Sequence, residues 1–138
     1  MKVLDFGARD GQLKAIIEFY LKQASVTSLD KEPQNHNVEH FEWTGNNKLP
    51  FNDNEFDVIV CIGTMNYIPY KNVNGLIQEF NRVLRTDGKL IIAYSWKLNP
   101  FNFDGVSYFH CDHVAEIFRT HKRTIKGYLS YIWWEATK

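Results

Sequence analysis

The sequence has no excess of either charge and no long hydrophobic run. Its 138 residues contain 16 Lys and Arg against 16 Asp and Glu, so the formal net charge is zero. A protein that binds nucleic acid through its phosphates usually carries a basic excess, and the balanced charge argues against such a partner. No apolar run approaches the length that crosses a bilayer, so we also expect no membrane partner.

Cysteine is scarce, and the two cysteines form neither a metal motif nor a redox motif. Cys61 lies in an apolar run and is expected in the core, and neither it nor Cys111 belongs to a CxxC pair. His110 and His113 flank Cys111, but three such close residues without a fourth ligand do not predict a zinc site. Reduced thiols and the lack of a secretory signal predict a cytoplasmic protein without a metal.

The pattern of apolar residues alternates between strands and helices. Strands are expected over residues 2–6, 25–30, 38–43, 56–63 and 89–96. Helices are expected over residues 11–24, 73–85 and 112–121, and an extended, aromatic-rich hairpin over 124–137. This order predicts a single α/β domain over residues 1–138, with a mainly parallel sheet and an antiparallel C-terminal hairpin.

The turn after the first expected strand has the chemistry of a ligand-binding loop. The segment KVLDFGARDGQL places Asp5, Gly7 and Gly11 there. Ligands bind outside the carboxyl ends of parallel strands, and a glycine lets the main chain approach a ligand closely. The phosphate-loop motif GxxxxGK[ST] and the dinucleotide motif GxGxxG are both absent, since Arg9 stands where the second glycine would be.

The segment VLDFGARDG resembles the first motif of class I S-adenosylmethionine-dependent methyltransferases, DxGxGxG. Three further segments resemble this family in the same order: TSLD, which ends in Asp30, LPFNDNEFDVIV over residues 49–60, and RVLRTDGKLIIA over residues 82–93. The resemblance runs from Val3 to Ala93. It implies a Rossmann-like class I methyltransferase fold, the cofactor S-adenosylmethionine, and methyl transfer to an unidentified small-molecule or protein acceptor.

The resemblance also implies a cofactor site at the carboxyl ends of the first, second and fourth strands. Asp30 would hold the two ribose hydroxyls, since a charged acceptor forms strong hydrogen bonds; its alternative role is that of a turn residue. Gly7 would lie nearest the cofactor, and Asp5 would act near its methionine end or orient the glycine loop. The complete set implied is Asp5, Phe6, Gly7, Gly11, Asp30, Lys31, Asn46, Asn47, Ile62, Gly63 and Met65.

Three features depart from the family pattern. Arg9 replaces the middle glycine of the loop, and its side chain would either crowd the cofactor or point into solvent. Gly45 stands where the family often has an acid that accepts from the adenine amino group, so Asn46 or Asn47 would supply a carbonyl, or the main chain would hold the amine. The N-terminal helix that the family usually has does not precede the first strand here. We expect that a partner chain or residues 97–109 would replace it, or that it is lost together with the activity.

No catalytic constellation stands out in the sequence. Tyr67 and the group Tyr108, His110 and His113 are candidate general bases, although the two histidines also suit the capping of a helix. The departures from the family pattern keep a second hypothesis open. In it the chain is a non-catalytic methyltransferase-like module, a scaffold or regulatory subunit that works within a homo- or hetero-oligomer.

Overall fold

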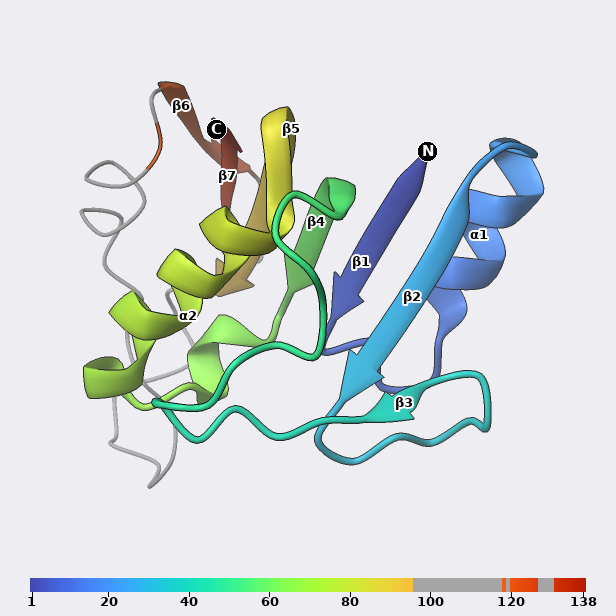
Figure 1. Cartoon of the computed structure of the whole chain (residues 1–138), viewed down its shortest axis with the longest axis horizontal. Helices are drawn as coiled ribbons and strands as arrows, with labels where there is room; N and C mark the ends of the chain where they lie inside the picture. Colours follow the sequence, from blue (N-terminus) through green and yellow to red (C-terminus); the bar gives the residue numbers. More distant parts are fainter. Residues whose placement is uncertain (96–117, 119, 127–130) are drawn as a thin grey trace.

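The described residues form one seven-stranded sheet flanked by helices (Figure 1). The computed structural model describes residues 1–95, 118, 120–126 and 131–138. Across the sheet the strand order is β3-β2-β1-β4-β5-β7-β6. Strands β1 to β5 pair in parallel, and β7 pairs antiparallel with β5 and β6. The elements are β1 (Lys2–Phe6), α1 (Gln12–Tyr20), β2 (Ser25–Asp30), β3 (Glu39–His40), β4 (Phe56–Ile62), the 3-10 turn η1 (Met65–Tyr67), α2 (Tyr70–Val83), β5 (Leu84–Ser95), β6 (Thr120–Lys126) and β7 (Tyr131–Thr137).

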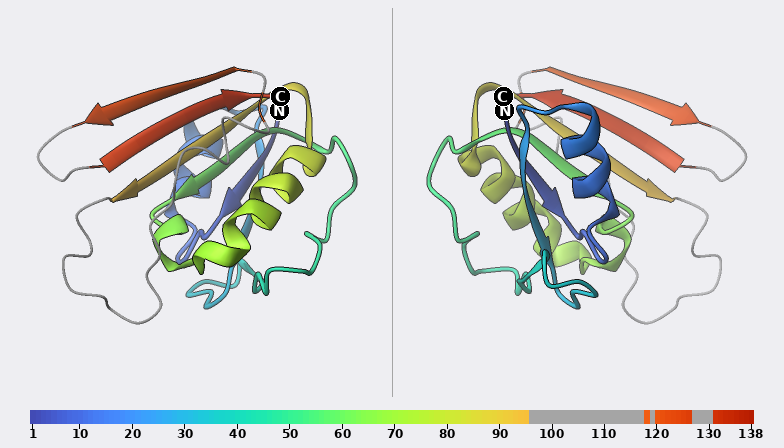
Figure 2. Two further views of the ribbon diagram at one scale, coloured as in Figure 1. Left: turned by 90° about the vertical axis from the view of Figure 1, so that its left-hand side faces the viewer. Right: turned by 90° about the vertical axis from the view of Figure 1, so that its right-hand side faces the viewer.

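Helices α1 and α2 cover opposite faces of the sheet (Figure 2). Successive side chains of a strand point to opposite faces, so β1 sends Leu4 and Phe6 into the main core beneath α2. Val3 joins a smaller cluster beneath α1, together with residues of β2 and β4. Cys61 is fully buried in the main core, as expected. This arrangement confirms the predicted Rossmann-like α/β fold with a mainly parallel sheet.

Helix α1 is shorter than the sequence pattern indicates. It ends at Tyr20 and not at the predicted Ala24. The Ala24 amide donates to the Leu21 carbonyl at 2.8 Å and closes a turn, and the Ser25 amide donates to the Met1 carbonyl at 2.8 Å and starts β2 beside β1. The helix therefore stops early because the chain has to reverse before it can join the sheet.

Only part of the apolar stripe of α1 is used in packing. Leu13 and Ile17 contact the small cluster under this helix. The other apolar residues at helical spacing, Ile16, Tyr20 and Leu21, lie on the surface, because one short helix reaches the sheet along a single line of contacts. The large apolar side chains that α1 and its C-terminal cap expose are Ile16, Phe19, Tyr20 and Leu21.

Two charged side chains of α1 cover the open edge of β2. Lys14 Nζ donates to the Val26 carbonyl at 2.8 Å, and Glu18 Oε1 accepts from the Val26 amide at 3.0 Å. Strand β3 pairs only with Leu29 and Asp30, so among the described residues no strand lies on the outer side of this half of β2. Charged side chains at such an edge block the addition of a foreign strand.

Helix α2 starts earlier and ends earlier than predicted. It begins at Tyr70 instead of residue 73, because the Pro69 carbonyl accepts from the Asn72 amide at 2.8 Å and forms the first turn. It ends at Val83, and the next residue already pairs with Phe56 as part of β5. Residues 86–88, with the sequence TDG, were expected to end the helix but lie inside β5, where Asp87 has a φ of 62°. The apolar residues that recur at helical spacing in this segment are all fully buried, as expected for a helix that packs on a sheet: Leu76, Ile77, Phe80, Val83 and Leu84.

The sheet edges also differ from the prediction. The strand expected over residues 38–43 shortens to Glu39–His40, because β2 ends at Asp30 and offers no further partner. Residues 112–117 of the expected helix 112–121 lie outside the described residues, and its predicted end is wrong, since Thr120 and His121 belong to β6. Strands β6 and β7 pair from Thr120 with Thr137 to Lys126 with Tyr131.

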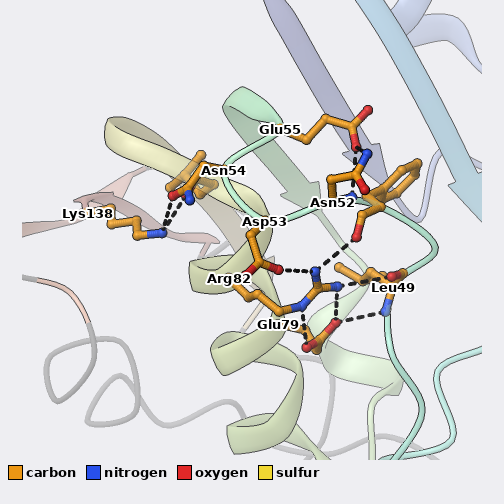
Figure 3. Close-up of polar contacts among 10 residues, drawn as sticks. Leu49, Asn52, Asp53, Asn54, Glu55, Glu79, Arg82 and Lys138 are labelled. Atoms are coloured by element: carbon orange, nitrogen blue, oxygen red, sulfur yellow. Dashed lines mark hydrogen bonds and ion pairs between the residues drawn. The ribbon is translucent and has the colours of Figure 1, made fainter.

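An ion-pair network fastens the loop between β3 and β4 to α2 (Figure 3). Arg82 donates to the carbonyls of Phe51 at 2.9 Å and Leu49 at 3.1 Å, and pairs with Glu79 at 2.7 Å and Asp53 at 2.8 Å. Glu79 Oε2 in turn accepts from the Leu49 amide at 2.9 Å. Hydrogen bonds from Arg82 lower the pKa of Glu79. Helix α2 thus sets the course of the loop that follows the carboxyl end of β3.

Replacing Arg82 tests this network. We expect Arg82→Ala to lower the free energy of unfolding by about 2–4 kcal/mol, because Glu79 and two main-chain carbonyls lose their donor in a largely buried setting. Arg85→Ala is the control, since Arg85 pairs with Asp57 at 2.6 Å but leaves most of its side chain exposed, and exposed pairs contribute about 0–1 kcal/mol. Chemical denaturation measures both variants. Equal losses would contradict the role assigned to Arg82.

Candidate functional site

The loop after β1 crosses the carboxyl end of β2. The amides of Gly7 and Ala8 both donate to the Leu29 carbonyl, at 2.8 and 3.0 Å, and the Arg9 amide donates to Asp30 Oδ2 at 2.7 Å. This end of the sheet is where ligands bind in folds of this kind. The predicted residues of the first two strands are therefore brought together in one place.

Asp30 ties two segments of main chain together. Its Oδ2 accepts from the Arg9 amide, and its Oδ1 accepts from the Glu32 amide, each at 2.7 Å. The turn role considered for Asp30 is therefore present in the structure. A carboxylate has about four acceptor positions, so two remain for a ligand, and the ribose role stays a prediction.

Arg9 takes the backbone conformation of the glycine that it replaces. Its φ is 51°, in the left-handed region, where a side chain costs about 1–2 kcal/mol. The residue is exposed, and its carbonyl accepts from the Gln34 amide at 2.8 Å. The exposure of Arg9 agrees with a side chain that points into solvent, and its position relative to a bound cofactor stays a prediction.

Thr64 occupies the space above Gly7. A Cβ built on Gly7 would collide with Thr64 Oγ1, and this oxygen lies 3.4 Å from the carbonyl oxygens of Phe6 and Ile62. The missing Cβ therefore admits Thr64, where we had expected it to admit a ligand. Sequence analysis missed Thr64, because its only signal is the adjacency of β1 and β4 in the sheet order.

Asp5 and Ser28 are buried side by side beneath the start of α1. They are register partners on β1 and β2, and the Ser28 hydroxyl lies close enough to Asp5 to act on its pKa. Neither Asp5 Oδ2 nor Ser28 Oγ has a hydrogen bond of good geometry within the described part of the chain. Burial, and then the charges of Asp30 and Asp10, raise the pKa of Asp5 from 3.8 to about 6, and the Ser28 hydroxyl offsets this in part. Unpartnered buried polar atoms are rare, so this pair marks a point where a polar ligand group can bind.

Phe6 and Met65 belong to the core. Phe6 packs edge-on against Phe80 with ring centroids 5.2 Å apart, and Met65 is fully buried. Phe6 faces α2, away from Asp5, because side chains alternate along β1, and Met65 belongs to the same core cluster as Phe6. At the end of β4, Ile62 is exposed, and a Cβ built on Gly63 would have nothing within 4 Å. Of the predicted β4 residues, these two border the site.

Asn47 is used to hold its own turn together. Its Oδ1 accepts from the Thr44 amide at 2.8 Å and from Thr44 Oγ1 at 2.9 Å, and its Nδ2 donates to the Glu42 carbonyl at 2.9 Å. Asn46 Oδ1 accepts only from Thr44 Oγ1, at 3.1 Å. Asn46 therefore keeps more capacity for a ligand than Asn47. Lys31 pairs with Glu42 at 3.8 Å on the surface.

Helix α2 packs tightly against this turn. Trp43 Nε1 donates to the Asn72 carbonyl at 3.0 Å. Gly45, with a φ of 98°, lies against the Asn72 side chain, and a Cβ on Gly75 would come within 3.2 Å of the Gly45 carbonyl. Gly45 thus suits a close helix contact, which a bulkier residue such as the family's acid would not fit.

The remaining candidate bases are only partly placed. Tyr67 is exposed just after β4, whereas Tyr108, His110 and His113, like Cys111 and residues 97–109, lie outside the described residues. Among the described residues, no group of three His, Cys, Asp or Glu side chains could hold a metal ion. None of the helices in that part of the chain combines the length and the apolar character needed to cross a membrane.

Comparisons with known proteins point to one family. The model of the methyltransferase domain family matches residues 4–92, which include every residue of the predicted cofactor site but not Tyr108, His110 or His113. The sterol 4-C-methyltransferase strm-1 of Caenorhabditis elegans is 35% identical over 69 residues, which are 50% of this chain and 20% of that protein. The chain thus spans about a fifth of the length of this curated relative.

Solved structures show the same fold. The PH0226 protein from Pyrococcus horikoshii is 21% identical with a TM-score of 0.73, over 99% of this chain and 82% of that one. A TehB-like SAM-dependent methyltransferase from Corynebacterium glutamicum is 17% identical with a TM-score of 0.70, over 99% of this chain and 79% of that one. At this level of identity the likeness concerns the architecture.

Replacing Gly7 tests its contact with Thr64. We expect Gly7→Ala to lower the free energy of unfolding by about 2–4 kcal/mol, through the collision and a φ of 83°. Gly63→Ala is the control, since Gly63 has a φ of 73° but open space around it, and should lose about 1–2 kcal/mol. Adding Thr64→Gly to Gly7→Ala removes the collision, so the double variant should regain the stability that Gly7→Ala loses beyond the loss of Gly63→Ala. Strictly additive losses in this double-mutant cycle would show that the two residues do not interact.

The raised pKa of Asp5 predicts a particular pH dependence. Between pH 3.8 and about 6 the folded state holds a proton that the unfolded state releases, so this residue makes stability fall as pH rises through that window. A shift of this size corresponds to about 3 kcal/mol. Asp5→Asn removes the effect. The free energy of unfolding of this variant, relative to that of wild type, should therefore rise by up to about 3 kcal/mol between pH 4 and pH 8.

Urea denaturation at both pH values measures this difference. Glu39→Gln is the control, because Glu39 is an exposed carboxyl on β3, and this change removes a carboxyl without altering the buried pair Asp5 and Ser28. A pH-independent difference for Asp5→Asn would show that Asp5 titrates like an exposed carboxyl.

Proposed function

The chain belongs to the methyltransferase domain family, and from that premise we propose that it transfers a methyl group to a small-molecule or protein acceptor. S-adenosylmethionine is the cofactor that this family and its fold imply. The observation that carries the proposal is the pair Asp5 and Ser28, two buried polar side chains whose Oδ2 and Oγ atoms have no hydrogen bond of good geometry among the described residues. A cytoplasmic location remains part of the proposal, on the sequence features given above.

The residues of the site fit the cofactor. Asp30 keeps two acceptor positions at the carboxyl end of β2, which suit the two ribose hydroxyls. Asp5 Oδ2 and Ser28 Oγ suit the ammonium group at the methionine end, because a bound cation would give both buried atoms a partner. The open space at Gly63 admits an adenosyl group beside the end of β4.

The cofactor supplies a methyl group that its sulfonium already activates for transfer. The contribution of the chain is to bind and orient, since alignment of the reacting groups supplies a large part of the rate. The Asp30 bond to the Arg9 amide fixes the loop over β2, and the Thr64 contact fixes the same loop against β4. No general base is assigned, because an acceptor that carries no proton on its nucleophile does not need one.

The alternative is a non-catalytic methyltransferase-like module within a homo- or hetero-oligomer. Arg9 is one of its supports, and the exposed side chain of this residue is compatible with either hypothesis. Gly45 was another, and its close contact with Asn72 gives the glycine a structural reason. The two hypotheses separate on whether the chain binds S-adenosylmethionine.

Calorimetry with S-adenosylhomocysteine tests the proposal. We expect Asp30→Ala to weaken binding by about 1.5–3 kcal/mol, which is about 10- to 150-fold. Asp30→Asn, which keeps one acceptor oxygen, should lose less. Glu32→Ala is the control, since its exposed side chain lies nearby and its amide bond to Asp30 stays. Folded wild-type protein that binds neither S-adenosylmethionine nor its product at millimolar concentration would leave only the non-catalytic module.

A further inference from the structure

Asp5 is a buried carboxyl whose Oδ2 atom lacks a partner among the described residues. Its side chain is 3% exposed, and that of Ser28, its register partner on β2, is 2% exposed. Asp5 Oδ2 and Ser28 Oγ have no hydrogen bond of good geometry within the described segments. A buried anion is costly unless a cation pairs with it. The charge of Asp5 therefore depends on whether a cation is bound next to it.

The groups around Asp5 favour a protonated carboxyl. Burial, and then the negative charges of Asp30 and Asp10, raise the pKa of Asp5 to about 6, and the Ser28 hydroxyl acts in the opposite direction. On β4 the Cys61 thiol stays protonated, because burial and the charge of Asp5 both raise its pKa. Around pH 6, therefore, about half of the Asp5 carboxyls carry a proton.

The cations in the neighbouring segments are exposed or paired elsewhere. Arg9, in the loop after β1, is exposed. Lys14 of α1 pairs with Glu18 at 3.9 Å, and Lys31, which follows β2, pairs with Glu42 at 3.8 Å. No ion pair within the described part of the chain involves the buried carboxyl. A cationic ligand group would therefore be its counter-ion.

We propose that cofactor binding at this site is coupled to the loss of a proton from Asp5. The ammonium group of the cofactor binds beside Ser28 only when Asp5 is ionised, so acidification releases the cofactor. The proton of the carboxyl passes to the solvent, and an N–H of the ammonium group donates to Asp5 Oδ2 in its place. This coupling rests on the proposed function, which assigns the ammonium group to Asp5 and Ser28, and it adds regulation of that site by pH.

The direction of the coupling follows from the two states of the site. Asp5 titrates near pH 6 in the free protein, and a bound ammonium group lowers its pKa, because an opposite charge favours the ionised form. Above about pH 7 the carboxyl is ionised in both states, and the affinity is constant. Below about pH 6 the free protein has to lose a proton before it binds, so the affinity falls by up to about tenfold per pH unit.

Calorimetry with S-adenosylhomocysteine at pH 5 and pH 7 tests the coupling. The ammonium group of this ligand stays protonated over that range, and we expect wild type to bind about tenfold more weakly at pH 5. Titrations at pH 6 in two buffers with different enthalpies of ionisation should show that about half a proton is released per ligand bound. Equal affinities at pH 5 and pH 7, with no proton released at pH 6, would overturn the proposal.

Two variants separate Asp5 from other groups that titrate in this range. Asp5→Asn should bind equally at pH 5 and pH 7 and release no proton, because the amide does not titrate. The double variant His36→Gln/His40→Gln is the matched control, since both histidines are exposed and an ordinary histidine titrates near pH 6.5. It should keep the pH dependence of wild type. Loss of that dependence in the histidine variant and not in Asp5→Asn would contradict the role of Asp5.

Ser28→Ala tests the coupling with the carboxyl still in place. This variant loses the hydroxyl that lowers the pKa of Asp5, so Asp5 should be more fully protonated at pH 6. Ligand binding at that pH should then release more than half a proton. A smaller release than in wild type would contradict the proposal. Thermal unfolding at pH 5 and pH 7 checks that each variant remains folded.

The ligand 5′-methylthioadenosine tests the part played by the ammonium group. It shares the adenosine and the thioether of S-adenosylhomocysteine but has no amino-acid end, so its affinity should change less than twofold between pH 5 and pH 7. A tenfold change for this ligand as well would overturn the role given to the ammonium group.

The same titrations keep the coupling separate from the proposed function. If wild type binds S-adenosylhomocysteine without any dependence on pH, only the coupling fails. If wild type does not bind it at pH 7, the proposed function fails first.

Discussion

The contact between Thr64 and Gly7 holds the two sides of the site together. It joins the loop that follows β1 to the segment that follows β4, and it exists only because residue 7 has no Cβ and a positive φ. On one side of it lie the acids of β1 and β2, and on the other lies the end of β4 with Ile62 and Gly63. Any change that separates these two residues would move both halves of the site.

The polar residues around the site divide into those with complete hydrogen bonding and those without it. Arg82, Glu79 and Asn47 use their polar atoms on nearby main chain and on each other, and so they shape the loop between β3 and β4. Asp5 and Ser28 are as buried as the core yet leave atoms unpaired. Since an unpaired buried polar atom is costly, this difference separates the residues that build the fold from the pair that we propose for cofactor binding.

Local pattern predicted much of the fold, and it failed where packing decides. The stripe of α2 is buried as predicted because both its spacing and its composition suit a helix against a sheet. The same kind of stripe on α1 misled, since a nine-residue helix buries none of its residues fully. Strand β3 is shorter than predicted because its partner β2 ends at Asp30. Nothing in residues 38–43 themselves indicates where β2 ends.

The sequence by itself determined the fold class, the order of strands and helices up to β5, and the position of Asp5, Gly7 and Asp30 at strand ends. These follow from periodicity and from turn chemistry, which act between residues close together in the chain. Only the tertiary structure decided that Thr64 covers Gly7, that Ser28 lies beside Asp5, that Arg9 is exposed, and that the Asn47 amide is already used. The strand contacts depend on the register between segments far apart in the sequence, and the states of Arg9 and Asn47 depend on how their loops pack against the sheet and α2.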